Sequence, residues 1–116
     1  MELKEGMYAR TLDGIMKIVE LRNDGVMGRF RNEDGNIYFY NDMMCNPSFN
    51  IIDLIECLDI VELYIIGLEE DNITTIKRPE TLRELKDLKK YIKSGAKIKS
   101  ITTKEQFESM SYKVGE

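Results

Sequence analysis

Four basic side chains recur at intervals of three and four residues, the spacing that places side chains on one face of an α-helix. A stripe of this kind can contact phosphates or an acidic protein surface. The alternative is a solvated helix face with no partner. The stripe is a candidate partner-binding site, with both interpretations open. Its members are Arg83, Lys86, Lys90 and Lys93.

The charge of the chain is divided by position along the sequence. Residues 1–76 contain 6 Lys+Arg and 15 Asp+Glu, a net of −9, whereas residues 77–99 contain 9 and 3, a net of +6. An acidic body repels a nucleic-acid backbone, and only Tyr91 interleaves with the basic residues as a ring for base stacking. We therefore expect a protein or ribonucleoprotein partner and no direct binding of nucleic acid.

The acidic residues support a second hypothesis, in which carboxylates imitate a phosphate track and occupy a nucleic-acid groove on another protein. Most of them fall in predicted turns, where acidic residues are expected in any soluble protein. The candidates are Asp24, Glu33, Asp34, Asp42, Asp53, Glu56, Asp59, Glu62, Glu69, Glu70 and Asp71.

Three consecutive aromatic residues, Tyr38, Phe39 and Tyr40, form a second candidate surface. Alternation along a strand predicts that Phe39 points inward and that both tyrosines point outward. Exposed tyrosines are good interface anchors, which makes Tyr38 and Tyr40 candidate partner-binding residues. The alternative is that the predicted helix covers them.

The residue types argue against enzymatic chemistry. The chain has no histidine, which removes the commonest general acid–base and nitrogen metal ligand. Cys45 and Cys57 are too few for a cysteine zinc site, and we expect them to be free thiols. Asp53 and Glu56 offer too few oxygens for a hard cation. No phosphate-cradling glycine loop or nucleophile elbow is present. The sequence predicts no catalytic residue, metal or cofactor.

Residues 1–56 are predicted to form a small, highly curved antiparallel barrel of the SH3-like kind. Asp13-Gly14, Asn23-Asp24-Gly25 and residues 33–36 are turn signals about ten residues apart, between β-rich runs. In the run over residues 15–22, alternation puts Ile18 and Leu21 on opposite sides. Residues 50–56 fit either a helical turn or a last strand. Gly28, inside a strand, predicts a sharp bend or a close crossing.

Residues 57–116 are predicted to add a hairpin, a helix over 78–94 and a C-terminal β-α-β segment that closes with a strand over 111–114. Pro79 suits the first turn of the helix, residues 81–84 have capping-box spacing, and Gly95 suits its end. The expected apolar stripe of the helix consists of Leu82, Leu85, Leu88 and Ile92. The fold class is α+β. Because the sequence has no apolar run of about 20 residues and no apolar leader core, we expect no membrane partner and a place in the cytosol.

Three stretches of the sequence resemble small uncharacterised accessory proteins from phages and prophages of Firmicutes. They are EGMYART (5–11) continuing into IMKIV (15–19), NIIDLIE (50–56) and ITTKEQFESMSYKV (101–114). The sequence departs from the pattern at residues 57–59, where relatives tend to read Val-Gly-Asp and this chain has Cys57-Leu58-Asp59. The basic helix is also not part of the family pattern.

The resemblance implies a phage or prophage accessory protein acting in a bacterial cytoplasm, a setting that includes anti-CRISPR proteins and other inhibitors of host defence. It supplies no catalytic or ligand residues. The leading hypothesis is a non-enzymatic protein that binds and inhibits a host macromolecule. A second is a binder that sequesters a signalling nucleotide through Arg10, Arg29, Arg31 and the lysine-rich helix. A third is a structural or housekeeping phage protein.

Overall fold

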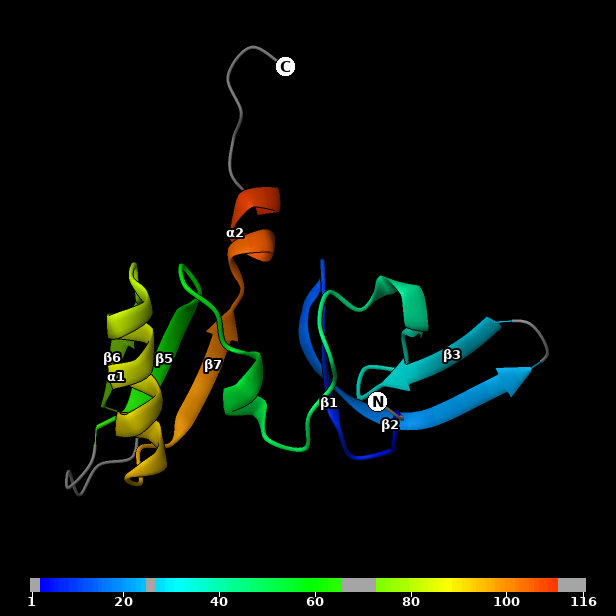
Figure 1. Ribbon diagram of the computed structural model, residues 1–116, viewed down its shortest axis with the longest axis horizontal. Coiled ribbons are helices and arrows are strands. Elements are labelled where there is room, and N and C mark those ends of the chain that lie inside the picture. Colours follow the sequence, from blue (N-terminus) through cyan, green and yellow to red (C-terminus); the bar gives the residue numbers. More distant parts are fainter. Residues whose placement is uncertain (1–2, 25–26, 66–72, 111–116) are drawn as a thin grey trace, which may run out of the picture. The chain divides into compact units, whose positions relative to one another are not determined.

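The computed structural model describes residues 3–24, 27–65 and 73–110 (Figure 1). The chain divides into two compact units, Met1–Leu54 and Ile55–Glu116, so the division falls two residues before the expected one. The described residues form antiparallel sheets and two α-helices, which confirms the α+β class.

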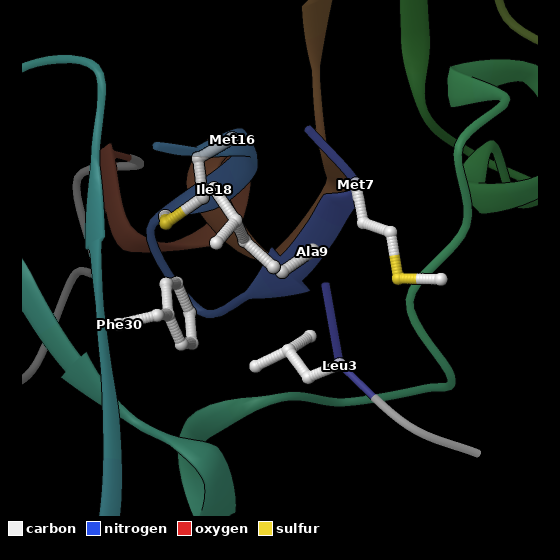
Figure 2. Packing of buried hydrophobic residues seen from close by; sticks show 6 residues of the cluster. All are labelled: Leu3, Met7, Ala9, Met16, Ile18 and Phe30. Atoms are coloured by element: carbon white, nitrogen blue, oxygen red, sulfur yellow. The ribbon is translucent and has the colours of Figure 1, made fainter. Parts of the chain in front are cut away.

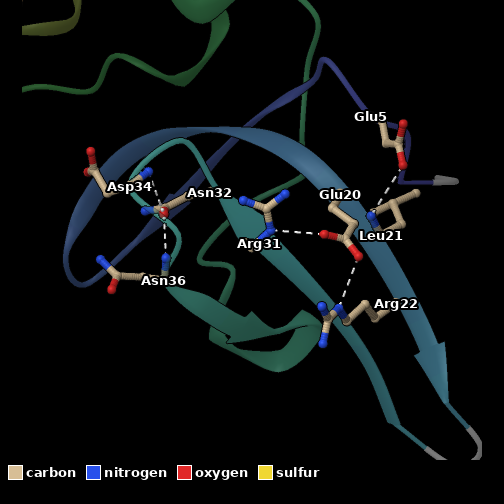
Figure 3. A network of polar contacts seen from close by, with 8 residues as sticks. All are labelled: Glu5, Glu20, Leu21, Arg22, Arg31, Asn32, Asp34 and Asn36. Carbon is tan, nitrogen blue, oxygen red and sulfur yellow. Dashed lines mark hydrogen bonds and ion pairs between the residues drawn. The ribbon is translucent and has the colours of Figure 1, made fainter.

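The N-terminal unit is a curled four-stranded antiparallel sheet in the order β1-β2-β3-β4. The register pairs Thr11 with Gly14 across the predicted first turn, where Gly14 has a φ of 113°. The third predicted turn is also present, because the Asn32 side chain accepts hydrogen bonds from the N–H groups of Asp34 and Asn36 (Figure 3). The second turn lies partly outside the described residues. The strands are β1 Tyr8–Thr11, β2 Gly14–Asp24, β3 Met27–Asn32 and β4 Ile37–Phe39.

A bulge in β2 overturns the expected alternation. The pairing of β2 with β3 shifts between Ile18 and Glu20. A bulge inserts one extra residue into a strand and so reverses the side on which later residues point. Ile18 is buried, and Leu21 packs against the same core although the strict period of two puts it on the opposite side.

The core of this unit gathers buried side chains from the N-terminal segment and three strands (Figure 2). Phe30 of β3 is fully buried within it. Two 3-10 turns complete the unit, η1 Tyr40–Asp42 and η2 Ile51–Leu54, so the ambiguous stretch at 50–56 is a helical turn. The cluster consists of Leu3, Met7, Ala9, Met16, Ile18 and Phe30.

The C-terminal unit is a three-stranded antiparallel sheet in the order β6-β5-β7. Both outer strands run antiparallel to β5 and therefore parallel to each other, with α1 connecting them over one face (Figure 1). The predicted hairpin, helix and following β-α segment are present, and the strand expected at 111–114 lies outside the described residues. The elements are β5 Ile60–Tyr64, β6 Thr74–Lys77, α1 Leu82–Lys93, β7 Ile98–Thr102 and α2 Lys104–Met110.

Helix α1 begins four residues later than predicted. Thr81 is its N-cap, with its side chain accepting a hydrogen bond from the Glu84 N–H at 3.1 Å. Pro79 therefore precedes the helix instead of lying in its first turn, and its carbonyl accepts from the Leu58 N–H at 2.7 Å. Gly95, with a φ of 128°, follows the last turn as expected.

The apolar stripe of α1 is shorter than predicted. Leu88 and Ile92 are buried and Leu85 is half-buried, but Leu82 is 79% exposed. At 100° per residue, Leu82 lies about 100° around the helix from the direction midway between Leu88 and Ile92. The first turn thus points a leucine away from the sheet.

Candidate functional site

The predicted basic stripe lies on α1, and three of its four residues line a shallow hollow of about 340 Å³. These three are Lys86, Lys90 and Lys93. Arg83 is exposed on the same helix but does not line the hollow. We call the complete set of lining residues the basic flank: Leu82, Leu85, Lys86, Lys89, Lys90 and Lys93.

Lys89 belongs to the basic flank and was not among the predicted site residues. On a helical projection it falls between the apolar and basic stripes, so neither stripe includes it. The available signal was its spacing, three residues after Lys86 and four before Lys93, which places all three on one face.

The basic flank combines an apolar end, at the start of α1, with uncompensated positive charge. Leu82 and the half-exposed stem of Leu85 supply the apolar surface. Within the described parts of the chain, no carboxylate lies within ion-pair distance of the lysines of the basic flank. Lysine stems extend the apolar surface while their ammonium groups stay in water. The surface suits a partner that offers both apolar groups and negative charge.

The opposite side of α1 borders a larger groove of about 610 Å³. Leu88 and Tyr91 supply apolar lining, Asp87 lies on the helix side, and Lys77 and Arg78 come from the end of β6 and the residue after it. Both signs of charge meet here, so charge alone selects no class of ligand. Arg78 also lies over the ring of Phe107 at 5.7 Å.

The aromatic residues point in the reverse of the predicted directions. Tyr38 and Tyr40 are half-buried and pack against the core of the N-terminal unit, whereas Phe39 is 43% exposed. The register explains the difference, because Tyr38 pairs directly with the buried Phe30 and cross-strand partners share a face. Their rings stack with centroids 5.6 Å apart. Neither tyrosine therefore presents its ring as a free anchor.

The hydroxyl of Tyr38 donates a 2.8 Å hydrogen bond to Oδ2 of Asp13. The pKa of Tyr38 is raised to about 12, chiefly because burial removes water from the hydroxyl. The hydrogen bond to Asp13 and repulsion from the carboxylates of Asp13, Asp34 and Asp42 raise it further. The tyrosine is thus a fixed hydrogen-bond donor at physiological pH.

Two of the three arginines proposed for a nucleotide site, Arg10 and Arg31, are buried or bonded to a carboxylate. Arg10 is fully buried, and its Nη1 donates to the Leu54 carbonyl at 2.9 Å. Arg31 bonds Glu20 at 2.9 Å, and Arg22 bonds the same carboxylate at 3.1 Å (Figure 3). Hydrogen bonds from Arg31 and then Arg22 hold the pKa of Glu20 below its ordinary value. Arg10 cannot reach a bound ligand.

Fewer acidic residues remain as candidates for imitating phosphates. Asp59 is fully buried, where its carboxylate accepts hydrogen bonds from the N–H groups of Glu56 and Lys104. It therefore cannot imitate a phosphate on the surface. Glu69, Glu70 and Asp71 lie outside the described residues, as does the side chain of Asp24.

The remaining chemical features of the described residues are few. Cys45 and Cys57 are not joined in a disulfide. No three His, Cys, Asp or Glu side chains among the described residues group closely enough to hold a metal ion. In that same part of the chain, no helix has the length and apolar character needed to cross a bilayer.

The comparisons with known proteins assign no family. The chain matches no family model, and neither a curated protein nor a solved structure is significantly similar to it.

Proposed function

We propose that this protein is a non-enzymatic binding protein whose basic flank docks onto an acidic surface of a macromolecular partner. The observation that carries the proposal is the exposed Leu82 at the start of α1, followed on the same side of the helix by lysines that have no described carboxylate partner. Exposing a leucine to water costs about 25 cal/mol per Å² of apolar area, a cost that a partner removes when it covers the leucine.

A protein partner fits the basic flank better than a nucleic acid. The lining of the flank contains leucines and no aromatic ring on which a base can stack. An acidic protein surface that also offers apolar side chains complements both features. In the phage setting that the resemblance implies, such a contact would inhibit a host protein or ribonucleoprotein, as anti-CRISPR proteins do, in the bacterial cytoplasm.

In this proposal the N-terminal unit serves as a scaffold and does not supply the basic flank. Its curled, four-stranded antiparallel meander with short connections supports an SH3-like barrel as the scaffold. The nucleotide-sequestering alternative is weaker, because Arg10 is buried and Arg31 is bonded to Glu20.

The test is a pull-down from host lysate with the full chain and two charge-reversal variants. Lys86→Glu/Lys89→Glu/Lys93→Glu reverses the charge of three of the four lysines of the basic flank. Lys4→Glu/Lys17→Glu/Lys97→Glu makes the same change in net charge at exposed lysines outside it. We expect one stoichiometric partner to be recovered by the wild type and by the control variant and to be lost with the flank variant.

Two further measurements sharpen this test. Leu82→Ser should weaken the same partner without any change in charge, and nuclease treatment of the lysate should leave recovery unchanged if the contact is with protein. Equal recovery by the flank variant and its control would show that α1 is a solvated face, and the proposal would fail.

A further inference from the structure

Strand β6 forms one edge of the sheet in the C-terminal unit (Figure 1). The Ile65 N–H donates to the Ile73 carbonyl at 3.3 Å, so Ile73 points its backbone groups at the segment of β5. Because these directions alternate along an antiparallel pair, Thr74 and Ile76 point their N–H and C=O groups away from β5. These outward groups have no hydrogen-bond partner among the residues that the structure describes.

The side chains along this edge are apolar and exposed. Ile76 is 65% exposed and Ile73 is 41% exposed. Ile76 shares a face of the sheet with its cross-strand partner Glu62, whose carboxylate accepts a hydrogen bond from the Thr74 hydroxyl at 3.1 Å. On the other face, Thr75 lines the groove beside α1. The edge therefore offers backbone donors, backbone acceptors and apolar area to a further strand.

The other sheet edges have the features that keep edges from pairing. The outer side of β1 is covered by Ser48, which exchanges two backbone hydrogen bonds with Tyr8. Strand β4 is three residues long. The pairing of β7 with β5 shifts at Lys99, whose charged side chain is exposed. Short strands, bulges and lysines all hinder edge pairing, and residues 73–76 have none of them within the described part of the chain.

The charges beside β6 suit a second copy of this chain. Two cations, Lys77 and Arg78, and two anions, Glu84 and Asp87, line the groove between β6 and α1. A balanced surface of this kind gives no net attraction to a strongly charged partner. A second copy brings the same balance of charge, so its approach is not opposed by net repulsion.

The backbone of β6 is also complementary to itself. A two-fold axis beside Thr75 places Thr74 of each copy opposite Ile76 of the other, and each such pair can exchange two hydrogen bonds. Thr75 then faces its own equivalent as a pair without hydrogen bonds. The two Ile76 side chains become diagonal neighbours on one face. One symmetric contact thus satisfies every outward backbone group of Thr74 and Ile76.

We infer that the protein forms a two-fold dimer in which the β6 strands of two copies pair antiparallel and join their sheets into one. Both outer edges of the joined sheet are β7, where the bulge and Lys99 hinder further pairing, so assembly stops at two copies. The basic flank lies on the side of α1 away from the groove, and the dimer does not depend on the function proposed for that flank.

Sedimentation velocity of the full chain tests the dimer. We expect reversible dimerisation with a dissociation constant of about 10–100 μM, as a small interface gives. Ile76→Lys should weaken dimerisation at least about tenfold, because it removes the apolar contact and places two ammonium groups near the axis. Met110→Lys makes the same change at a 70% exposed residue of α2 and should leave the constant within about twofold. Circular dichroism checks that both variants fold.

Disulfide trapping tests the register, in full-length protein that also carries Cys45→Ser/Cys57→Ser so that one cysteine is present. Thr75→Cys should crosslink two copies under mild oxidation, because facing Cα atoms in a pair without hydrogen bonds are about 4.5 Å apart. Ile76→Cys, with a diagonal separation of about 7–8 Å, should crosslink at least about fivefold less. A monomer at millimolar concentration, equal dimerisation of Ile76→Lys and Met110→Lys, or equal crosslinking by the two cysteines would each overturn the inference.

Discussion

Leu58 has a φ of 72°, in the left-handed region that L-residues other than glycine rarely adopt. Leu58→Gly should raise the free energy of unfolding by about 1 kcal/mol, because the strain of the left-handed backbone exceeds the extra entropy that glycine gains on unfolding.

Urea unfolding measures this effect, with Leu58→Ala as its control. Alanine shortens the side chain, which is 39% exposed, but keeps the unfavourable φ. It should therefore give no gain in stability. If glycine proves no more stable than alanine at this position, the backbone carries no strain there.

Gly28 of β3 lies against the ring of Tyr40, which is a close side-chain contact and not the sharp bend or strand crossing that its place in a strand predicted. A Cβ atom at this position would lie 2.6 Å from Cδ2 and 2.7 Å from Cζ of the tyrosine. Gly28→Ala should lower the free energy of unfolding by about 2 kcal/mol, because the ring has to move from its place against the core.

A double-mutant cycle with Tyr40→Ala tests the cause of this loss. The penalty of Gly28→Ala should largely disappear when the ring is absent, which gives a coupling energy of about 1 kcal/mol or more. Additive losses would assign the effect to the backbone of β3 instead.

Side-chain directions next to this glycine were beyond what the sequence could predict. Alternation gives two possible faces for Tyr38 and Phe39, and only the pairing of Tyr38 with Phe30 selects one. Because β4 has three residues, its own pattern contains too few positions to fix that choice.

Asp59 connects two elements that are far apart in the sequence. Its two carboxylate oxygens accept from the Glu56 N–H at 2.8 Å and from the Lys104 N–H at 3.0 Å, at the start of α2. Asp59→Asn should lower the free energy of unfolding by about 2 kcal/mol, because the new amide NH₂ faces an N–H donor inside the protein.

The measurement is urea unfolding followed by circular dichroism, with Asp53→Asn as the control at an exposed carboxylate. Asp53 accepts a side-chain hydrogen bond from Ser48, and asparagine can still accept it. A similar loss in both variants would show that burial of Asp59 has no special role.

At the level of elements, local signals predicted positions better than orientations. The Thr81 and Gly95 signals place α1 close to its observed bounds, and the capping pattern at Thr103 and Gln106 is present at α2. The bulge in β2 and the exposure of Leu82 were not predicted. Both depend on how a strand or helix packs against the rest of its unit, and a short sequence pattern does not determine that packing.

For the whole molecule, the raised pKa of Tyr38 predicts that the free energy of unfolding falls at high pH. Its pKa is about 12 in the folded protein and 10 ordinarily, so folding favours the protonated hydroxyl. The contribution is complete below pH 10 and is lost as the pH rises towards 12. Tyr38→Phe should lack this part of the slope.

The measurement is the unfolding free energy of the wild type and of Tyr38→Phe at intervals from pH 9 upward. The difference between the two proteins isolates the contribution of the Tyr38 hydroxyl, because other groups that titrate in this range are present in both. We expect the difference to narrow as the pH rises through this range. A constant difference would mean that the hydroxyl titrates at its ordinary pKa.

The division of charge is smaller when it is counted over the two units. Residues 55–116 contain 11 Lys+Arg and 12 Asp+Glu, a net of −1, and residues 1–54 contain 6 and 9, a net of −3. Charge counts along the chain could locate the basic helix, but only the fold shows which side of α1 carries the basic flank.

The hydrogen bond from Arg10 to the Leu54 carbonyl also has a consequence for recombination between genes. It joins β1, the first strand of the chain, to the last residue of the N-terminal unit. A gene segment that stops short of codon 54 would encode β1 without this backbone acceptor, whereas one that includes codon 54 keeps it. A gene fusion that carries this unit alone should therefore include codon 54.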